Sequence, residues 1–333
     1  MKKILAFIFL SFSLTANSQP KKIKLQADDI QIGKDYHEKF YATSQKSYRL
    51  KLKIDALEWD KQQAKTGETF TKLWFKNSLP DGNIGEPEIP VVKKLICIPL
   101  GASVSARVSK FKMDEVQLSA KGIQYPLLPV QPSARKDQDT LQLPFHLKPE
   151  AYRKSTFQSV KPEVLVEVMG NLRGYTIARL TVRPVEYNPA HQKIRVFSDV
   201  EVDVDIQEAD TKSASKTNPY YSPYFDVVYK SMLNAGGATY DEHPDLTRYP
   251  VSMLIVSHRM FETALQPFVE WKTQKGFSVT VKYTDEIGAT SDAIKTYIQG
   301  VYNSATPENP APTFLVIVGD VEQVPASATG SQS

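Results

Sequence analysis

From about residue 48 to residue 206, apolar and polar positions alternate with a period of two, as in half-buried strands. The segment YRLKLKID (48–55) alternates leucine or isoleucine with lysine. The segment SDVEVDVDIQ (198–207) places valine and isoleucine on one face and three acids on the other, which predicts a solvated acidic face. Many short strands without a long helix are typical of a β-sandwich or jelly-roll-like domain, with further strands at 91–98, 102–112, 163–169 and 174–187.

After Pro250 the pattern changes to strand, helix, strand, helix, strand. The run VSMLIVS (251–257) is apolar throughout, as expected for a strand covered on both faces. Helical spacing follows up to Gly276, with Ser257 as the predicted N-cap, and a second helix is expected to begin at Ser291 as its cap. Strands at 277–283 and 313–319 complete a βαβαβ unit, which predicts a parallel, doubly wound sheet.

The segment 208–248 separates the two patterns. It begins with small and polar residues and becomes aromatic around Tyr220, Tyr224 and Phe225. Disordered segments rarely carry so many aromatic residues. We therefore expect the later part of the segment to be a strap that packs on one of the domains.

The first residues, MKKILAFIFLSFSLTANSQ, carry two lysines, an apolar run, and then small residues at Ala16 and Ser18. This pattern predicts a signal peptide over residues 1–18, cleaved after Ser18. The apolar run is shorter than the ~20 residues of a spanning helix, so no transmembrane segment is expected. The mature chain is expected to be exported in soluble form, periplasmic in transit and then extracellular or at the cell surface.

The charge and the cysteine content of the chain argue against a nucleic-acid partner and exclude an intrachain disulfide. The formal net charge is +4, and the basic run KKIK (21–24), expected to be solvated, is too short to indicate a nucleic-acid partner. Cys97 is the sole cysteine, which excludes an intrachain disulfide. It alternates with Leu95 and is expected to serve as a small hydrophobe facing a core.

Candidate site residues follow the strands of the parallel sheet, where ligands gather in such folds. They are Asp320 after the last strand, His258 after the first, and Asp285 with Glu286 after the second. Each has a structural alternative: Asp320 caps a turn, His258 sits beside a helix start, and the other two acids solvate a loop. One further reading places a cation, such as a structural calcium, between Asp285 and Asp320; no other cofactor is expected.

No complete catalytic site is visible in the residues themselves. The chain lacks Gly-x-Ser-x-Gly, Gly-x-Gly-x-x-Gly, Walker, His-Glu-x-x-His and Cys-x-x-Cys motifs. Cys97 lies in the β-rich half and is a poor thiolate candidate. The sequence therefore predicts an unfinished sheet without a nucleophile and base pair.

Several motifs together resemble the gingipain-type cysteine peptidases. The carboxyl-terminal part resembles the start of their catalytic domain, and the preceding part resembles their propeptide, so that the likeness covers nearly the whole mature chain. The segments that carry it are PVSMLIV (250–256), the helix end WKTQKG (271–276), PTFLVIVGD (312–320), GEPEIP (85–90), YPLLPVQP (125–132), LPFHLKPEAY (143–152) and GNLRGYTIARLTVRPVEYNP (170–189).

The resemblance implies a secreted zymogen whose propeptide contacts the peptidase domain and whose full-length form acts on polypeptides. It implies a caspase-like α/β fold, with a catalytic cysteine and a His-Gly histidine that follow later strands. This chain has no His-Gly and no cysteine after residue 97, so we expect it to be truncated and inactive. The expected organisation is a signal peptide (1–18), a β-rich propeptide (19–207), a linker and activation segment (208–248) and the first part of the peptidase domain (249–333).

Two zymogen features have candidate residues. Activation requires a cleavable connection, and Lys230 and Arg248 are the basic residues at its two ends. A propeptide residue can inhibit a peptidase of this family by occupying its specificity pocket. Arg135 and Lys136 are the candidates for that residue, and the alternative is that they belong to an ordinary solvated loop. The alternative for the whole chain is a secreted, non-enzymatic binding protein that acts through its β-domain as an inhibitor or chaperone.

Overall fold

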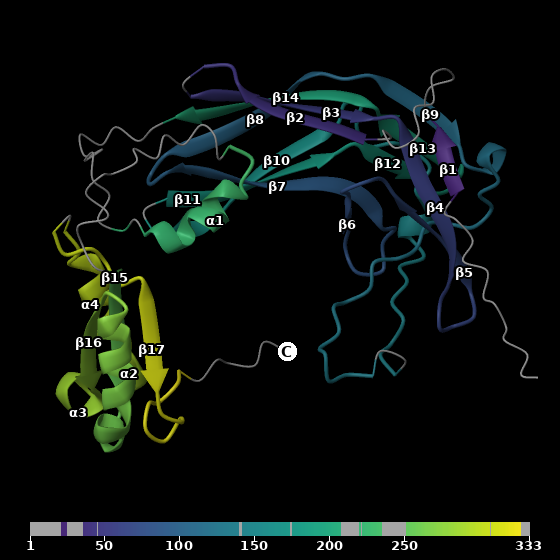
Figure 1. The fold of residues 1–333 in the computed structure, drawn as a ribbon. Coiled ribbons are helices and arrows are strands. Elements are labelled where there is room, and N and C mark those ends of the chain that lie inside the picture. The colour runs from purple at the N-terminus through teal and green to yellow at the C-terminus, as the bar shows by residue number, and fades with distance from the viewer. Residues whose placement is uncertain are drawn as a thin grey trace, which may run out of the picture.

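The computed structural model describes residues 21–24, 36–44, 46–139, 142–173, 175–207, 220, 222–234, 251–306 and 308–327. The predicted signal peptide and Arg248 lie outside the described residues. The chain forms a large antiparallel β-domain and a smaller α/β unit (Figure 1). This confirms a mostly sheet protein with few helices.

The β-domain is built from short strands joined by turns. Its sheets have the orders β2-β3-β14-β8, β10-β11-β7-β6, β12-β13-β9 and β1-β4-β5, and the pairs within them are antiparallel. The strands are β1 (Lys21–Lys24), β2 (Tyr36–Ala42), β3 (Ser47–Ile54), β4 (Ala56–Gln63), β5 (Thr69–Trp74), β6 (Leu79–Asp81), β7 (Ile89–Pro99), β8 (Ser103–Lys110), β9 (Met113–Gln117), β10 (Glu163–Leu172), β11 (Tyr175–Arg183), β12 (Val185–Asn188), β13 (Lys193–Phe197) and β14 (Asp199–Gln207).

One hydrophobic core joins the two four-stranded sheets. Alternate residues of β3 and β14, among them Leu52 and Val202, are fully buried against Ile96 of β7 and Leu180 of β11. The period of two in the sequence is the cause, because alternate side chains of a strand point to the same face. The basic run at 21–24 forms β1 and pairs with β4, and the Lys21 side chain is exposed, as expected.

The acidic face predicted for β14 is not open to solvent. Arg49 of β3 and Arg107 of β8 both bind Asp203, at 2.7 and 3.3 Å, and Lys51 binds Glu201 at 3.0 Å. The side chain of Glu201 is only 11% exposed as a result. The prediction failed because β14 lies between two basic strands that are distant in sequence.

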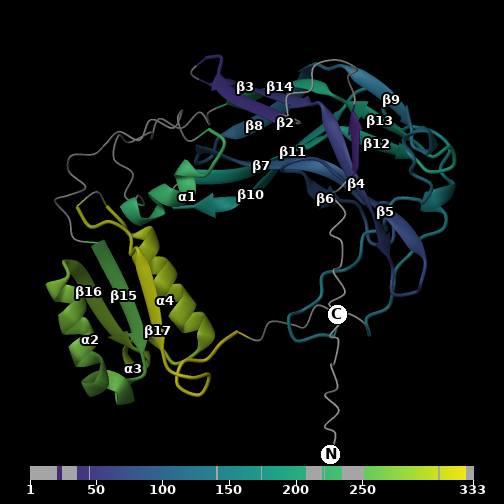
Figure 2. The ribbon, with the colours of Figure 1, turned by 45° about the vertical axis from the view of Figure 1, so that its right-hand side comes forward.

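The α/β unit has the predicted order. It consists of β15 (Val251–Ser257), α2 (Glu262–Gln274), β16 (Phe277–Tyr283), α3 (Thr284–Ile287), α4 (Ser291–Asn303) and β17 (Phe314–Val318). The central strand β15 pairs in parallel with β16 and with β17. Helices α2 and α4 cover opposite faces of the sheet (Figure 2), since Ile255 packs with the residues of α2 and Leu254 with those of α4.

The helix caps differ by one residue from those predicted. Helix α2 is preceded by a 3₁₀ turn whose cap is His258, and α4 is capped by Thr290, whose Oγ1 accepts from the Ala293 amide at 3.2 Å. Ser257 is instead buried and donates to the carbonyl of His258 at 3.0 Å. Among the described residues no helix has the length and apolar character needed to cross a membrane.

Candidate functional site

The carboxyl ends of the parallel strands bring together part of the predicted set. Arg259, which the sequence analysis missed, donates to both carboxylate oxygens of Asp285, at 2.9 and 3.0 Å, and to Glu286 at 2.7 Å. Its guanidinium lies 4.0 Å from the ring centroid of Tyr283. These hydrogen bonds lower the pKa of Asp285 and of Glu286, so both acids are held ionised by an internal cation.

Asp320 and His258 have structural roles. The Asp320 carboxylate accepts from the Val321 amide at 2.7 Å. His258 Nδ1 accepts from the Met260 amide at 3.2 Å, as an N-cap does. Gly319 has φ 140°, and a Cβ there would lie 2.9 Å from Cβ of Gln323. The strand therefore ends in a tight turn that only glycine fits.

A metal site is not apparent in the part of the chain that the structure describes. No group of three or more histidine, cysteine, aspartate or glutamate side chains there is arranged to hold an ion. Asp285, one of the two acids of the predicted cation site, already has both carboxylate oxygens bound by Arg259. The structural calcium thus stays a prediction without support from this strand edge.

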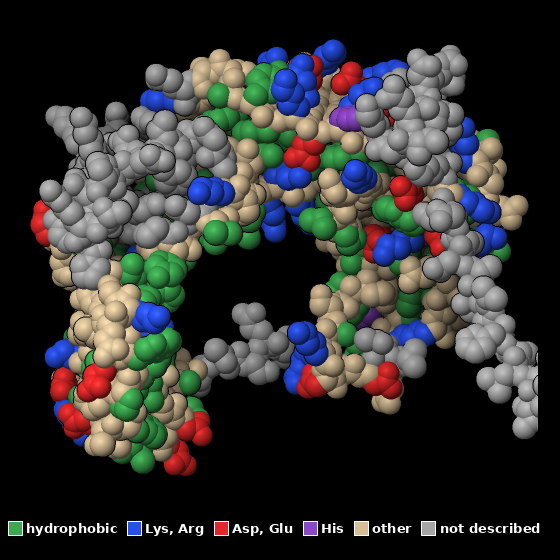
Figure 3. Space-filling view, in the orientation of Figure 1, with side chains coloured by type: hydrophobic (Ala, Val, Ile, Leu, Met, Phe, Trp, Pro, Cys, Tyr) green, Lys and Arg blue, Asp and Glu red, His purple; other side chains and the backbone are tan. Residues whose placement is uncertain are grey.

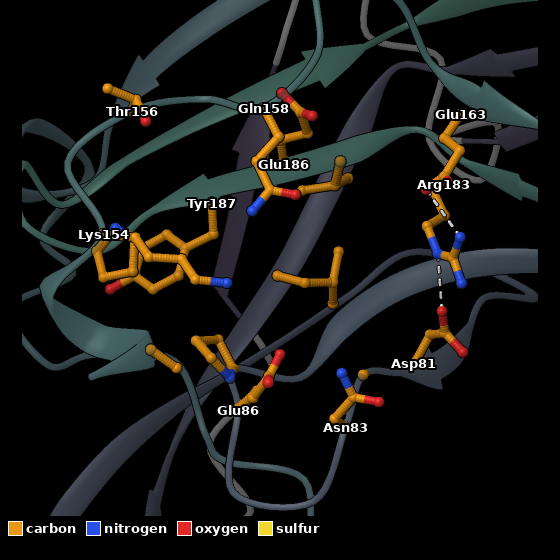
Figure 4. Close-up of a pocket in the computed structure, with 16 residues that line it drawn as sticks. Asp81, Asn83, Glu86, Lys154, Thr156, Gln158, Glu163, Arg183, Glu186 and Tyr187 are labelled. Carbon is orange, nitrogen blue, oxygen red and sulfur yellow. Dashed lines mark hydrogen bonds and ion pairs between the residues drawn. The ribbon is translucent and has the colours of Figure 1, made fainter. Parts of the chain in front are cut away.

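A pocket of about 350 Å³ lies in the β-domain, away from the parallel sheet. At one end Arg183 donates to Asp81 at 2.9 Å and to Glu163 at 2.8 Å, and the Lys154 side chain reaches in from the opposite side (Figure 4). Burial raises the pKa of Glu186 and raises that of Tyr187 to about 12. The lining residues include no histidine or cysteine, so the pocket holds no Cys-His pair of a cysteine peptidase.

The loop with Arg135 and Lys136 projects from the β-domain on the side where the α/β unit lies (Figure 1). The Gln131 side chain closes the base of the loop, because its amide donates to the His146 carbonyl at 2.8 Å and accepts from the His146 amide at 2.9 Å. The Arg135 side chain is 75% exposed and pairs with Asp137. The loop therefore has a base that is fixed by two hydrogen bonds and a basic side chain that is exposed to solvent.

Lys230 lies at the end of α1 (Asp226–Lys230), in the segment predicted to be a strap. The preceding residue, Tyr229, is fully buried, and Met232 is 5% exposed. Both pack against Cys97 and Ile177 of the β-domain. The strap prediction is therefore confirmed for the described residues 220 and 222–234, which we call the strap.

Cys97 is buried beneath the strap. Its side chain is 4% exposed, and burial raises the pKa of the thiol to about 12. The Asn234 side chain covers it from the strap by accepting from the Cys97 amide at 2.9 Å and donating to its carbonyl. A neutral, enclosed thiol cannot serve as a peptidase nucleophile.

The chain matches known families and proteins over nearly its full length. The model described as the C25 propeptide matches residues 37–232, and that of peptidase family C25 matches residues 246–332. Lys-gingipain of Porphyromonas gingivalis is 35% identical over 329 residues, which are 97% of this chain and 18% of that protein. Gingipain R2 of Porphyromonas gingivalis is 21% identical over 319 residues, which are 91% of this chain and 40% of that protein.

A solved structure gives the same relationship. It comes from work on the zymogenic latency of gingipain K from Porphyromonas gingivalis, and it is 32% identical, with a TM-score of 0.51. The likeness covers 57% of this chain and 100% of the solved chain. This chain spans less than a fifth of the length of Lys-gingipain, so these matches concern one region of that protein.

Proposed function

Because the chain belongs to the C25 family of peptidases, we propose that it comes from the zymogen of a secreted, gingipain-type cysteine endopeptidase. In this proposal residues 19–207 are the β-rich propeptide, residues 249–333 are the first part of the peptidase domain, and polypeptides are the substrates. The observation that carries the proposal is the succession of a C25 propeptide match and a C25 peptidase match along one chain, in the order of a zymogen.

The α/β unit is, in this proposal, the start of a caspase-like sheet that continues beside β17. Strand β17 lies at one edge of the sheet order β16-β15-β17. Two of its side chains, Leu315 and Ile317, are 45% and 54% exposed, although they belong to an apolar strand. An exposed apolar edge strand is the feature that a further strand and helix would cover.

The 131–146 loop is the proposed inhibitory element. Between this loop and the α/β unit the space-filling surface is open, with the described residues of the two parts lining opposite sides (Figure 3). A peptidase sheet that grows from β17 would extend into this opening. The exposed Arg135 and Lys136 would then reach a cleft built beyond the described strands.

DNA sequence beyond the codon for Ser333 is the first test of this proposal. The expected result is an open frame that continues into a His-Gly motif and a strand-terminal cysteine. The product should hydrolyse peptides and lose that activity when its thiols are alkylated, whereas residues 1–333 alone should hydrolyse none. A stop codon directly after Ser333 would contradict the enzyme proposal for this molecule.

Activation cleavage is proposed to follow Arg248 rather than Lys230. The Ser231 amide is bonded to the Val227 and Val228 carbonyls, both at 3.2 Å, so the bond after Lys230 belongs to a closed turn beside buried Tyr229. A peptidase needs an extended segment, and opening this one would expose buried side chains.

Limited digestion with trypsin, followed by mass spectrometry, tests this choice. Arg248→Ala is expected to remove the first interdomain cut, whose product begins at Tyr249. Lys230→Ala, the matched control, should leave the rate of that cut unchanged. A first cut after Lys230 in the native chain would show that the turn is open in solution.

A further inference from the structure

Arg173 is a buried arginine at the junction of the two parts. It follows β10 in the turn to β11, with φ 47° and 7% of its surface exposed. Its Nε donates to the Tyr220 carbonyl at 2.7 Å, Nη1 to the Pro312 carbonyl at 2.8 Å, and Nη2 to the Ala311 carbonyl at 3.1 Å. One guanidinium thus joins the β-domain, the strap and the segment that leads into β17.

Aromatic rings complete the surroundings of this cation. The guanidinium carbon lies 5.1 Å from the ring centroid of Phe225 and 5.9 Å from that of Tyr302. Burial lowers the pKa of Arg173, but a guanidinium remains protonated in proteins. The charge is therefore stabilised by carbonyl dipoles and π faces that come from both parts of the chain.

The first half of the strap contacts the α/β unit around Arg173. Tyr220 stacks on Tyr302 of α4 with centroids 5.0 Å apart, and Tyr224 meets Phe314 of β17 edge to face at 5.0 Å. The Thr313 hydroxyl donates to the Ser222 hydroxyl at 3.0 Å. These contacts form a small mixed interface, of the kind that joins domains within one chain.

The second half of the strap is bound to the β-domain. Tyr229 donates to the Leu172 carbonyl at 3.1 Å, directly beside Arg173 in sequence. The Leu233 amide donates to the Leu95 carbonyl at 2.9 Å, and Asn234 pairs with the main chain of Cys97. The strap therefore binds the edge of β7 opposite β11, beyond the residues of β7 that pair with β6, and leads directly to the interface with the α/β unit.

We propose that Arg173 and the strap form a clamp that holds the β-domain on the α/β unit without help from the covalent connection. The partner of this surface is the α/β unit itself, at residues 311–313 and Tyr302. A cut after Arg248 leaves the strap on the β-domain side, so the clamp stays intact when the connection is broken. The proposed binding between the two parts of the chain does not depend on the proposed function. Only the role of this binding in zymogen latency rests on that function.

Separation of the two parts after a designed cut tests the clamp. A specific protease site is placed between residues 236 and 247 of the full chain, the site is cut, and the fragments are analysed by size exclusion over a range of dilutions. Circular dichroism of each uncut variant checks whether its fold is kept. Fragments of the parent chain are expected to elute together.

Arg173→Met is expected to weaken the association of the fragments by about 100-fold, because truncating a buried, hydrogen-bonded charge leaves its acceptors unpaired. Arg173→Lys should weaken it as well, since an ammonium cannot span three carbonyls as a guanidinium fork does. The control is Arg179→Met, on the neighbouring β11, where Arg179 binds Glu167 at 2.8 Å on an exposed face. Its fragments should bind as those of the parent chain do.

Two results would overturn the clamp. One is that the parent fragments separate on cutting, and the other is that Arg173→Met fragments bind as tightly as the parent ones. Tyr302→Ala changes the α/β side alone and should also weaken binding, so the test holds even where an Arg173 variant folds poorly. None of these measurements uses peptidase activity, and failure of the clamp is thereby distinguished from failure of the proposed function.

Discussion

Arg135→Ala combined with Lys136→Ala is expected to weaken inhibition of a gingipain-type peptidase by this chain by about 100-fold, as truncation of a central anchor does. The expectation rests on the pinned base of the 131–146 loop and on its exposed basic tip. Hydrogen bonds at the base of a loop reduce the conformational entropy that the loop loses on binding, so the side chains of Arg135 and Lys136 contribute more to affinity.

Steady-state inhibition of Lys-gingipain and of gingipain R2 by purified variants measures this effect. The chain offers a matched control in Arg153 and Lys154, another exposed Arg-Lys pair on the β-domain. Replacing that pair by alanine removes the same charge and should leave inhibition unchanged. Equal inhibition by the parent and the Arg135/Lys136 variant would assign the loop to solvation alone.

Tyr229→Ala is expected to accelerate thiol labelling of Cys97 by roughly 150-fold to 5,000-fold, since losing a buried aromatic side chain costs about 3–5 kcal/mol and about 1.4 kcal/mol is tenfold. Tyr229 is fully buried, and its ring lies 5.2 Å from that of Tyr175. With the pKa of the thiol raised to about 12 by burial, Cys97 reacts only when the strap opens.

Maleimide labelling of the native chain at neutral pH, followed by mass spectrometry, reports how often the strap opens at one defined site, because Cys97 is the sole cysteine. Val227→Ala is the control, since that side chain lies on the same helix and is 78% exposed. It should leave the labelling rate near that of the parent chain. A Tyr229→Ala rate equal to the parent rate would mean that the strap does not protect the thiol.

Much of the fold could be predicted because the local spacing of apolar and polar residues determines it. The alternation in 48–55 and 198–207 gives β3 and β14, and the apolar run at 251–257 gives the central parallel strand. The strap was also predicted, because aromatic residues need a surface to cover. Its position across both parts was not predicted, since it depends on contacts that come only with the tertiary fold.

The candidate site was harder to predict for the same reason. Arg173 is 139 residues from Pro312 in sequence, and no local pattern marks the pair. Arg259 could not be predicted from its local sequence, because the acids that it binds follow a different strand. The solvated face of β14 was a wrong prediction, although the lysines of 48–55 were a visible sign of complementary charge.

The position of β14 also fixes when the β-domain can fold. It is the inner strand between β3 and β8, and its valines supply one wall of the shared core. At about 5–20 residues per second, β14 leaves the ribosome on the order of 10 s after β3 does. Throughout that interval β3 has an unpaired inner edge, so the nascent chain depends on being kept from aggregation until residue 207 arrives.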